Sequence, residues 1–245
     1  MPEKKQDIRK LSKAELKDFF TTKGDKTFRA TQVYEWLWQK SATSFAEMTN
    51  LSKTTRELLD QHFEIKAISL NSSQVSGDRT IKSTFKLHDD NIVEGVLIPT
   101  QKRMTACISS QVGCSLNCKF CATGQLKMER NLDSDEIYDQ VVQIRKQAEE
   151  NYNAPLTNIV YMGMGEPLLN YANMIQSVEY ITSEAGLGMS PRRITVSTAG
   201  IAKMIRKLGD DEVKFNLALS LHAANDKKRN EIMAINETNS LAELR

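Results

Sequence analysis

The sequence lacks the features of membrane and secreted proteins. It has no apolar run near the roughly 18 residues that a membrane-spanning helix needs. Its first ten residues, MPEKKQDIRK, are too polar for a secretory signal. The four cysteines, three of them in one short segment, suit a reducing cytoplasm better than a disulfide framework. We therefore expect a cytoplasmic protein that does not interact with a membrane.

Histidine, repeats and low-complexity segments are also scarce. Only three histidines are present, which limits the metal sites that the chain could build without cysteine. The 40% hydrophobic and 26% charged content is that of an ordinary globular protein. The 245 residues leave room for one sizeable core and a smaller accessory unit. We expect the chain to be a monomer.

Positive charge is concentrated at the start of the chain. The first 40 residues carry ten Lys and Arg against six Asp and Glu, in a protein whose net charge is only +2. Such an excess can follow the phosphates of a nucleic acid, and it is also typical of a solvated helical surface. Residues 1–63 are predicted to form a small helical domain that begins with a capping box of Ser12 and Glu15. Both tryptophans, Trp36 and Trp38, lie in it at a spacing that favours core packing over base stacking.

The remaining pattern predicts an α/β fold. Residues 64–103 are expected to be a linker that contains a β-hairpin of residues 80–87 and 91–98. Residues 104–245 alternate strands with helices, which implies a parallel sheet with right-handed crossovers and about four βα units of a partial (βα) barrel. The expected strands cover residues 105–112, 158–163, 193–198 and 215–222, and the helices after them begin at 133 or 134, 171, 200 and 225.

A cysteine-rich loop follows the first of these strands. Residues 105–124 read TACISSQVGCSLNCKFCATG, so Cys114, Cys118 and Cys121 have the spacing C-x3-C-x2-C. A closed structural zinc site needs four ligands, and Cys107 lies too far up the strand to join the loop. An iron–sulfur cube held by three cysteines leaves one iron open for a substrate or cofactor. A zinc site completed by a distant His and a redox dithiol of Cys118 and Cys121 are the alternatives.

Polar and small residues stand where the other strands are expected to end. In parallel sheets the chemistry gathers at the carboxyl ends of the strands. Gly163 and Gly165 would let the backbone approach a ligand, and Glu166 could accept hydrogen bonds from an ammonium or hydroxyl group. A tight turn before Pro167 is the structural alternative. The candidate residues are Cys114, Cys118 and Cys121 after the first strand, Gly165 and Glu166 after the second, Ser197 and Thr198 at the third, and Ser220, Leu221 and His222 at the fourth.

These motifs resemble a known family. The cysteine spacing, with Phe120 before the last cysteine, resembles the radical S-adenosylmethionine (SAM) superfamily. The ordered runs EGVLIP, TACISSQVGC, YMGMGEP, VSTAG and SLHA resemble the RlmN/Cfr family of RNA methyltransferases, over essentially the whole chain. Among these, the RlmN type methylates C2 of an adenosine in 23S rRNA and in certain tRNAs. The resemblance implies a radical SAM barrel, an RNA-binding N-terminal domain, a [4Fe–4S] cluster, SAM, and an electron donor such as flavodoxin or ferredoxin.

The resemblance also implies roles for individual residues. Cys114, Cys118 and Cys121 would hold the cluster. Gly165 and Glu166 would bind the methionyl amine of SAM, and Ser197, Ser220, Leu221 and His222 would complete its pocket. Glu94 would accept a proton from the RNA adduct, and Cys107 would resolve the protein–RNA intermediate through a transient disulfide bond. Adenine C2 is not nucleophilic, so radical chemistry explains what displacement could not achieve.

The sequence departs from the family in one respect. The family carries its methyl group on a cysteine near the C-terminus, whereas no cysteine follows Cys121 here, and the family barrel has six βα units rather than four. We therefore expect either a fragment of a longer protein or a natural short form, with an open edge on the sheet. A radical SAM enzyme for another substrate, a non-catalytic RNA-binding module and a zinc-binding structural protein are the alternative functions.

Overall fold

The computed structural model describes residues 5–245, and these form two compact units. The first holds the chain up to Ala67 together with Glu179–Met189, and the second holds Ile68–Val178 and Ser190–Arg245. The division into three domains expected from the sequence stays a prediction. No helix within residues 5–245 combines the length and the apolar character that a membrane span requires.

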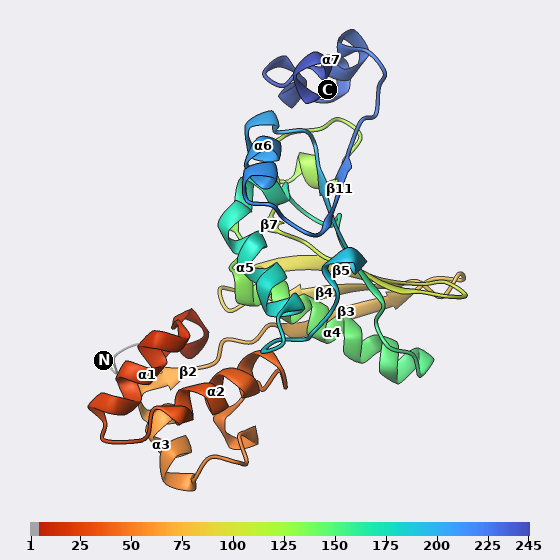
Figure 1. Ribbon diagram of the computed structural model, residues 1–245. Helices are drawn as coiled ribbons and strands as arrows, with labels where there is room; N and C mark the ends of the chain where they lie inside the picture. Colours follow the sequence, from red (N-terminus) through yellow and green to blue (C-terminus); the bar gives the residue numbers. More distant parts are fainter. Residues whose placement is uncertain (1–4) are drawn as a thin grey trace. The chain divides into compact units, whose positions relative to one another are not determined.

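The first unit is built from three helices (Figure 1). They are α1 (Lys13–Thr22), α2 (Phe28–Trp38) and α3 (Lys53–His62), with 3-10 turns at Ile8–Lys10 and Phe45–Glu47 and a short parallel pair of β1 (Gln6–Asp7) and β2 (Phe63–Glu64). The capping box predicted at the start of α1 is confirmed: the Ser12 hydroxyl accepts from the Glu15 amide, and the Glu15 carboxylate accepts from the Ser12 amide. These reciprocal bonds satisfy two backbone donors that the first turn leaves unpaired.

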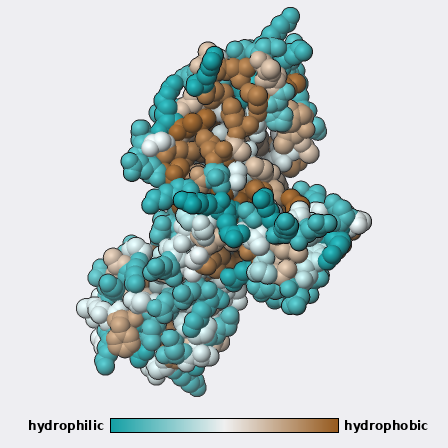
Figure 2. Space-filling model, turned by 45° about the vertical axis from the view of Figure 1, so that its right-hand side comes forward, coloured by the Kyte–Doolittle hydropathy of each residue, from teal (hydrophilic) through white to brown (hydrophobic). Residues whose placement is uncertain are grey.

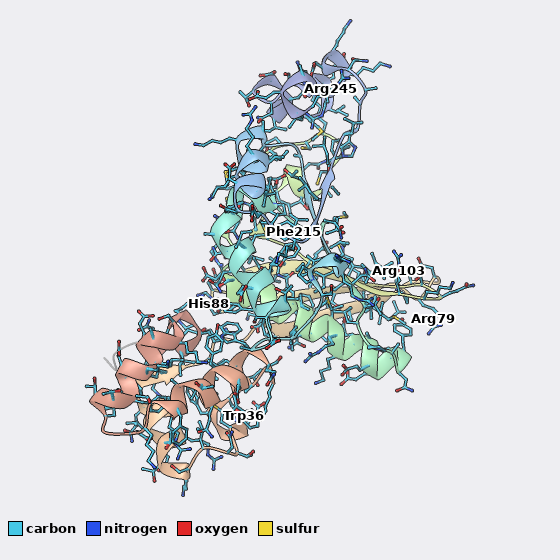
Figure 3. The ribbon with its side chains drawn as sticks, viewed as in Figure 1. Trp36, Arg79, His88, Arg103, Phe215 and Arg245 are labelled. Atoms are coloured by element: carbon cyan, nitrogen blue, oxygen red, sulfur yellow. The ribbon has the colours of Figure 1, made fainter. Side chains whose placement is uncertain are left out.

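The two tryptophans of α2 have different environments. Trp38 is 1% exposed and stacks on Tyr180, with ring centroids 3.6 Å apart. Trp36 lies at the surface of the unit, where its indole N–H donates to Asn50 Oδ1 at 2.6 Å and the ammonium of Lys40 sits 3.9 Å from its ring centroid (Figure 3). Core packing is therefore confirmed for Trp38, whereas Trp36 is half-buried.

The second unit contains one seven-stranded sheet in the order β11-β10-β9-β6-β5-β4-β3 (Figure 1). Its strands are β3 (Ser69–Val75), β4 (Ile81–Lys86), β5 (Ile92–Pro99), β6 (Met104–Cys107), β9 (Asn158–Tyr161), β10 (Ile194–Thr198) and β11 (Asn216–Leu219). Strands β3 to β6 pair antiparallel, and β6, β9, β10 and β11 run parallel. The predicted α/β class and the predicted hairpin of β4 and β5 are confirmed. That hairpin belongs to the same sheet as the parallel strands, because β5 bonds directly to β6.

The turns of the antiparallel strands define the two ends of the sheet (Figure 3). Arg79 and Arg103, from the β3–β4 and β5–β6 turns, lie at one end, and His88, from the β4–β5 turn, lies at the other. Strand β6 runs from the Arg103 end toward the His88 end. The loop that leaves β6 therefore emerges at the His88 end, as do the carboxyl ends of the other parallel strands.

The helices of the second unit follow the parallel strands. They are α4 (Ser134–Tyr152), α5 (Tyr171–Thr182, whose last residues belong to the first unit), α6 (Ala202–Asp210), α7 (Asp226–Ile232) and α8 (Leu241–Leu244), with 3-10 turns at Thr123–Gln125, Pro167–Asn170, Pro191–Arg193 and Ala234–Glu237. Helix α4 packs against β5 and β6. Its predicted apolar face is confirmed, since Ile137, Val141, Ile144 and Ala148 are all fully buried.

The first predicted parallel strand is shorter than expected. The sequence predicts one strand over 105–112, but β6 ends at Cys107, and Gln111–Val112 forms a separate strand, β7, antiparallel to β8 (Arg130–Asn131). The amides of Ser110 and Gln111 both donate to the carbonyl of Met164, at 2.8 and 3.2 Å, and this draws the chain out of the sheet. The turn lets the cysteine loop begin beside the loop that follows β9.

The sheet is open at β11. This strand is the outermost of the parallel ones, and Leu217 and Leu219 on it are 43% and 39% exposed. Leu221, just beyond the strand, is 47% exposed. Apolar surface also gathers in the upper part of Figure 2. The open edge predicted from the number of βα units is therefore present.

Candidate active site at the carboxyl ends of the parallel strands

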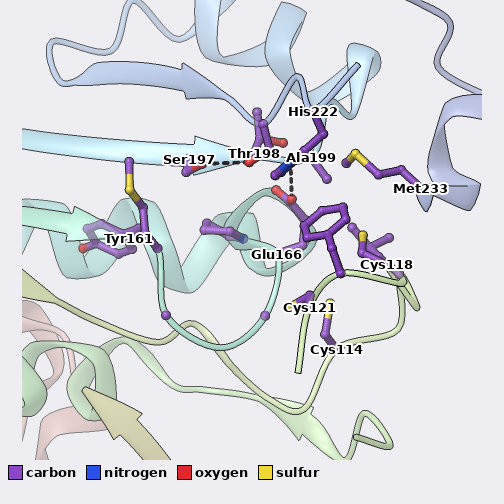
Figure 4. Close-up of a pocket in the computed structure, with 17 residues that line it drawn as sticks. Cys114, Cys118, Cys121, Tyr161, Glu166, Ser197, Thr198, Ala199, His222 and Met233 are labelled. Atoms are coloured by element: carbon purple, nitrogen blue, oxygen red, sulfur yellow. Dashed lines mark hydrogen bonds between the residues drawn. The ribbon is translucent and has the colours of Figure 1, made fainter. Parts of the chain in front are cut away.

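A pocket of about 270 Å³ lies where the loops after β6, β9, β10 and β11 meet (Figure 4). Each loop contributes side chains to it, because the carboxyl ends of parallel strands share one edge of the sheet. The pocket brings together nine of the ten candidate residues that the sequence singled out: Cys114, Cys118, Cys121, Gly165, Glu166, Ser197, Thr198, Ser220 and His222.

The cysteine loop folds back tightly on itself. Cys118 is buried, and Cys114 and Cys121 are half-buried. A Cβ on Gly124 would lie 2.7 Å from the carbonyl oxygen of Cys118, so the closure of the loop requires glycine at this position. Burial raises the pKa of Cys114 and of Cys118, and each of these two thiols also feels the negative charge of Cys121. The three sulfurs are therefore close enough to interact but need a positive partner to be thiolates together.

Arg130 fixes the far end of this loop. Its guanidinium donates to Asp89 Oδ2 at 2.6 Å and to both carboxylate oxygens of Glu136, at 2.7 and 2.8 Å. The hydrogen bond from Arg130 holds the pKa of Asp89 well below its ordinary value. These bonds join the β4–β5 turn, β8 and the first turn of α4, so the loop between β7 and β8 is anchored at its end.

The arrangement of the cysteines fits an iron–sulfur cluster. Among residues 5–245, no three His, Cys, Asp or Glu side chains converge closely enough to bind a single metal ion. In a [4Fe–4S] cube each cysteine binds a different iron, so its sulfurs stand further apart than the ligands of one ion. The loop thus has the sulfur donors of a cluster site.

Glu166 places a buried carboxylate opposite the cysteine loop (Figure 4). The residue is 3% exposed; its Oε1 accepts from the amide of Leu168 at 3.0 Å and its Oε2 from the amide of Ala199 at 2.7 Å. Burial raises the pKa of Glu166, although these hydrogen bonds and one from Thr198 oppose the shift. A carboxylate so placed has lone pairs left to accept hydrogen bonds from a cationic ligand.

The backbone before Glu166 requires glycine. Gly165 has a φ of +95°, and a Cβ on it would lie 2.5 Å from the Cβ of Gln111. The Gln111 side chain accepts from the Glu166 amide at 2.8 Å and donates to Asn131 at 2.7 Å. Gly165 and Gln111 together therefore aim the Glu166 side chain into the pocket.

The opposite wall is formed by the loops after β10 and β11. The hydroxyls of Ser197 and Ser220 lie 3.3 Å apart, so both can contact one ligand. His222 has a φ of +55°, and its ring lies against Phe120 with centroids 3.9 Å apart. Leu221 does not line the pocket, but its backbone lies between two residues that do, and its part in SAM binding stays a prediction.

The carboxylate of Glu94 is not brought into the pocket. Its side chain forms an ion pair with Lys82, with Oε1 and Nζ 2.6 Å apart, and remains partly exposed. Its backbone is held next to the site, because its carbonyl accepts from the Ser109 hydroxyl at 2.6 Å and its amide donates to Met164 Sδ at 3.4 Å. Glu94 therefore lies beside the pocket, near the end of the sheet where the site is formed.

Cys107 also lies outside the pocket. It is on β6, in register with Val96 of β5 and Val160 of β9. Burial raises the pKa of Cys107 to about 11, so the group is a thiol at neutral pH. All four cysteines are free, and the disulfide bond implied for Cys107 is not present.

Two residues that support the site were missed from the sequence: Met233, which lines the pocket, and Gln111, which bonds to Glu166 without lining it. Met233 is 1% exposed and packs against Cys118 and Ala199. Gln111 supports Glu166 as described. Residues 225–235 were predicted to be a helix, but nothing in their pattern connects them to a loop more than a hundred residues earlier.

Comparison with known proteins decides the family. Residues 6–65 match the ribosomal RNA large subunit methyltransferase N-terminal domain, and residues 108–242 match the radical SAM superfamily. The chain is 66% identical, over 97% of its length, to a probable dual-specificity RNA methyltransferase RlmN of Cytophaga hutchinsonii. It is 58% identical, over 98% of its length, to a protein of the same name from Flavobacterium psychrophilum. The chain belongs to the RlmN family of the radical SAM superfamily.

The fold has a solved counterpart. A crystal structure of a radical SAM methyltransferase from Sphaerobacter thermophilus superposes with a TM-score of 0.89 at 36% identity, covering 98% of this chain and 70% of that one. The predicted radical SAM fold is therefore confirmed. The chain spans about two thirds of its curated relatives, 65% of the Cytophaga protein and 70% of the Flavobacterium protein.

Proposed function

We propose that this protein binds a [4Fe–4S] cluster and SAM and takes part in methylating C2 of adenosine in 23S rRNA and tRNA. The observation that carries the proposal is the buried carboxylate of Glu166 facing Cys114 and Cys118 across one pocket. A three-cysteine loop needs an additional ligand for its open iron, and the amino acid end of SAM has a cationic group that a carboxylate would hold. The names of the relatives support RNA as the substrate.

The residues of the pocket divide the binding of SAM between them. Glu166 would accept hydrogen bonds from its ammonium group, with Gly165 letting the ligand approach the backbone. Ser197 and Ser220 would bind its polar oxygens, and Met233 would exclude water from the cysteine side. When bound, the cluster and SAM supply the one-electron chemistry that can modify a carbon as unreactive as adenine C2.

Glu94 and Cys107 would act on the RNA. The partly exposed Glu94 carboxylate, next to the pocket on β5, can accept a proton from a base that enters at this end of the sheet. Cys107 requires a group that takes its proton, because its pKa of about 11 keeps it protonated at neutral pH. The target base would have to leave its stack to reach either group.

The first unit would contribute RNA contacts. Phe28 is 49% exposed, with Arg29 4.9 Å and Lys26 6.0 Å from its ring centroid. An exposed ring beside two cations can stack on a base while the cations contact phosphates. The protein would work as a monomer in the reducing cytoplasm, supplied with electrons by a donor such as flavodoxin or ferredoxin.

Anaerobic reconstitution tests the cofactor part of the proposal. The 245-residue chain is incubated with iron and sulfide, and the matched variants are Cys118→Ala and Cys107→Ala. We expect about four irons per chain in the parent and in Cys107→Ala, and loss of the cluster absorption in Cys118→Ala. Reduced with dithionite in the presence of SAM, the reconstituted protein should release 5′-deoxyadenosine. Equal iron content in both variants would contradict the proposed cluster site.

RNA binding tests the substrate part. Fluorescence anisotropy with labelled tRNA should show an affinity that falls steeply with salt. Phe28→Ala should weaken binding by roughly tenfold, since base stacking is worth about 1–3 kcal/mol. Val75→Ala is the control, because it removes an exposed apolar side chain from β3 instead. Equal effects of the two substitutions would show that Phe28 has no specific role in RNA binding.

A further inference from the structure

Helix α7 buries an arginine behind the SAM pocket. Arg229 is 0% exposed, which is unusual for a guanidinium that has no direct carboxylate partner. Among the described residues, Asp226 is the carboxylate that acts electrostatically on Arg229. Asn236 links the two residues, because its side-chain amide donates to Asp226 Oδ1 at 2.8 Å and its oxygen accepts from Arg229. Removing an arginine from water without a paired anion is costly, so the position of this charge needs a reason.

The guanidinium joins two loops that line the pocket. Its Nε donates to the carbonyl of Leu221 at 3.1 Å, and its Nη2 donates to the carbonyls of Ser220, at 3.3 Å, and Ala199. Its Nη1 donates to Asn236 Oδ1. Ala199 follows β10, and Ser220 and Leu221 follow β11, so one side chain sets the spacing of both walls. The amide of Ala199 is also the donor to Glu166 Oε2, which connects Arg229 to that carboxylate through one residue.

The same helix contacts the cysteine loop. The carbonyl of Ile232 accepts from the amide of Lys119 at 3.0 Å, and Met233 packs against Cys118. The guanidinium lies close to this loop as well, because it bonds to the carbonyl of Ala199, and Ala199 packs in one cluster with Cys118 and Met233. A fixed cation near the sulfurs of an anionic cluster stabilises the reduced state, which carries one more negative charge.

We propose that Arg229 is a positioning residue for the cofactors. Its planar fork holds the loops after β10 and β11 at the separation that SAM needs, and its charge raises the reduction potential of the cluster that Cys114, Cys118 and Cys121 would hold. The inference rests on the proposed cofactor binding. It adds a residue that contacts neither cofactor and acts through backbone carbonyls and through its electric field.

Three variants separate the fork from the charge. Arg229→Lys keeps the cation but cannot make the forked bonds. Arg229→Gln removes both the fork and the charge. Lys228→Gln is the matched control, because it removes one positive charge from the same helix at an exposed position. Each reconstituted protein is assayed for iron content, for SAM affinity by anaerobic equilibrium dialysis, and for cluster potential by redox titration followed by electron paramagnetic resonance.

SAM affinity and the reduction potential of the cluster should respond differently to these substitutions. SAM affinity should fall roughly tenfold in both Arg229 variants, because each loses the charged, forked bonds to the carbonyls after β10 and β11. The reduction potential should fall in Arg229→Gln and stay unchanged in Arg229→Lys and Lys228→Gln. Parental SAM affinity in Arg229→Lys would overturn the role of the fork, and a parental potential in Arg229→Gln would overturn the role of the charge.

Two safeguards keep the test decisive. Where Arg229→Gln does not fold, Asn236→Ala takes its place. It removes the oxygen that accepts a hydrogen bond from Arg229 Nη1 and leaves the positive charge of Arg229 unchanged. Asn236→Ala and Arg229→Lys should then both show weaker SAM binding at an unchanged potential, and parental affinity in both would refute the proposal. A parent chain that binds neither iron nor SAM would instead refute the proposed function, so the two failures are distinguishable.

Discussion

Replacement of Glu166 by Gln should separate cofactor binding from folding. The substitution keeps the size of a side chain that is 3% exposed but removes its charge and one of two acceptor oxygens. The lost charge-assisted bond to an ammonium group is worth about 1.5–3 kcal/mol, which corresponds to SAM binding weakened by about ten- to a hundredfold. Iron content should not change, because Glu166 is not a cluster ligand in this proposal.

Stability should respond less than binding. An amide has one acceptor oxygen, so the N–H of Leu168 or Ala199 loses its partner at a cost of about 1–3 kcal/mol. Removing a buried charge offsets part of this cost. The pKa of Glu166 is raised in the folded protein, so the native state binds this proton more tightly than the unfolded state does. Stability from this group is therefore highest at low pH and falls as pH rises through the ordinary pKa to the raised one.

The assay is anaerobic calorimetric titration of SAM into reconstituted protein, together with urea unfolding at several pH values. Glu129→Gln is the control, because it neutralises a carboxylate of the cysteine loop that is about half exposed and paired with Lys127. SAM affinity within twofold of the parent in Glu166→Gln would refute the assignment of this carboxylate. A decline in stability with rising pH that persists unchanged in Glu166→Gln would show that other groups cause it.

Three further predictions follow from the geometry. Gly165→Ala places a Cβ 2.5 Å from the Cβ of Gln111 at a φ of +95°, so the variant should unfold at a lower temperature and lose SAM binding. A thermal unfolding curve equal to that of the parent would show that this steric clash does not occur. At pH 8, Cys107 should react with iodoacetamide roughly a hundredfold more slowly in the folded protein than in protein unfolded in urea, because folding raises its pKa from 9.0 to about 11. Peptide mass spectrometry measures both rates, and equal rates would refute the shift. Trp38→Ala should destabilise the chain by about 3–5 kcal/mol in urea unfolding, with Trp36→Ala costing much less as the control.

Elements with strong local signals were predictable from the sequence. The start of α4 is one example, since Asp133 and Glu136 form a capping box and the buried face repeats at helical spacing. Strand β3 was missed because SLNSSQV is polar and exposed along its whole length, so no alternation marks it. The early end of β6 could not be predicted, because it depends on a carbonyl, that of Met164, more than fifty residues later.

The candidate site was likewise predictable from the sequence only in part. The three cysteines lie in one short loop, so their proximity follows from the sequence alone. Glu166 and the strand-end serines could be placed by the rule that parallel strands end at one edge. The support of Glu166 by Gln111, the ion pair of Glu94 with Lys82 and the bonds of Arg229 depend on side chains that meet only after folding. Periodicity contains no information about such contacts.

Both tryptophans lie in the first unit, so the two units of the protein can be followed by different intrinsic spectroscopic signals. Tryptophan emission senses only the helical unit, with Trp38 stacked on Tyr180 and Trp36 beside Lys40. Circular dichroism averages over both units, and the iron–sulfur absorption of reconstituted protein would sense only the sheet unit. Recording all three signals during one denaturant titration would therefore show whether the two units melt together or one after the other, without adding any label.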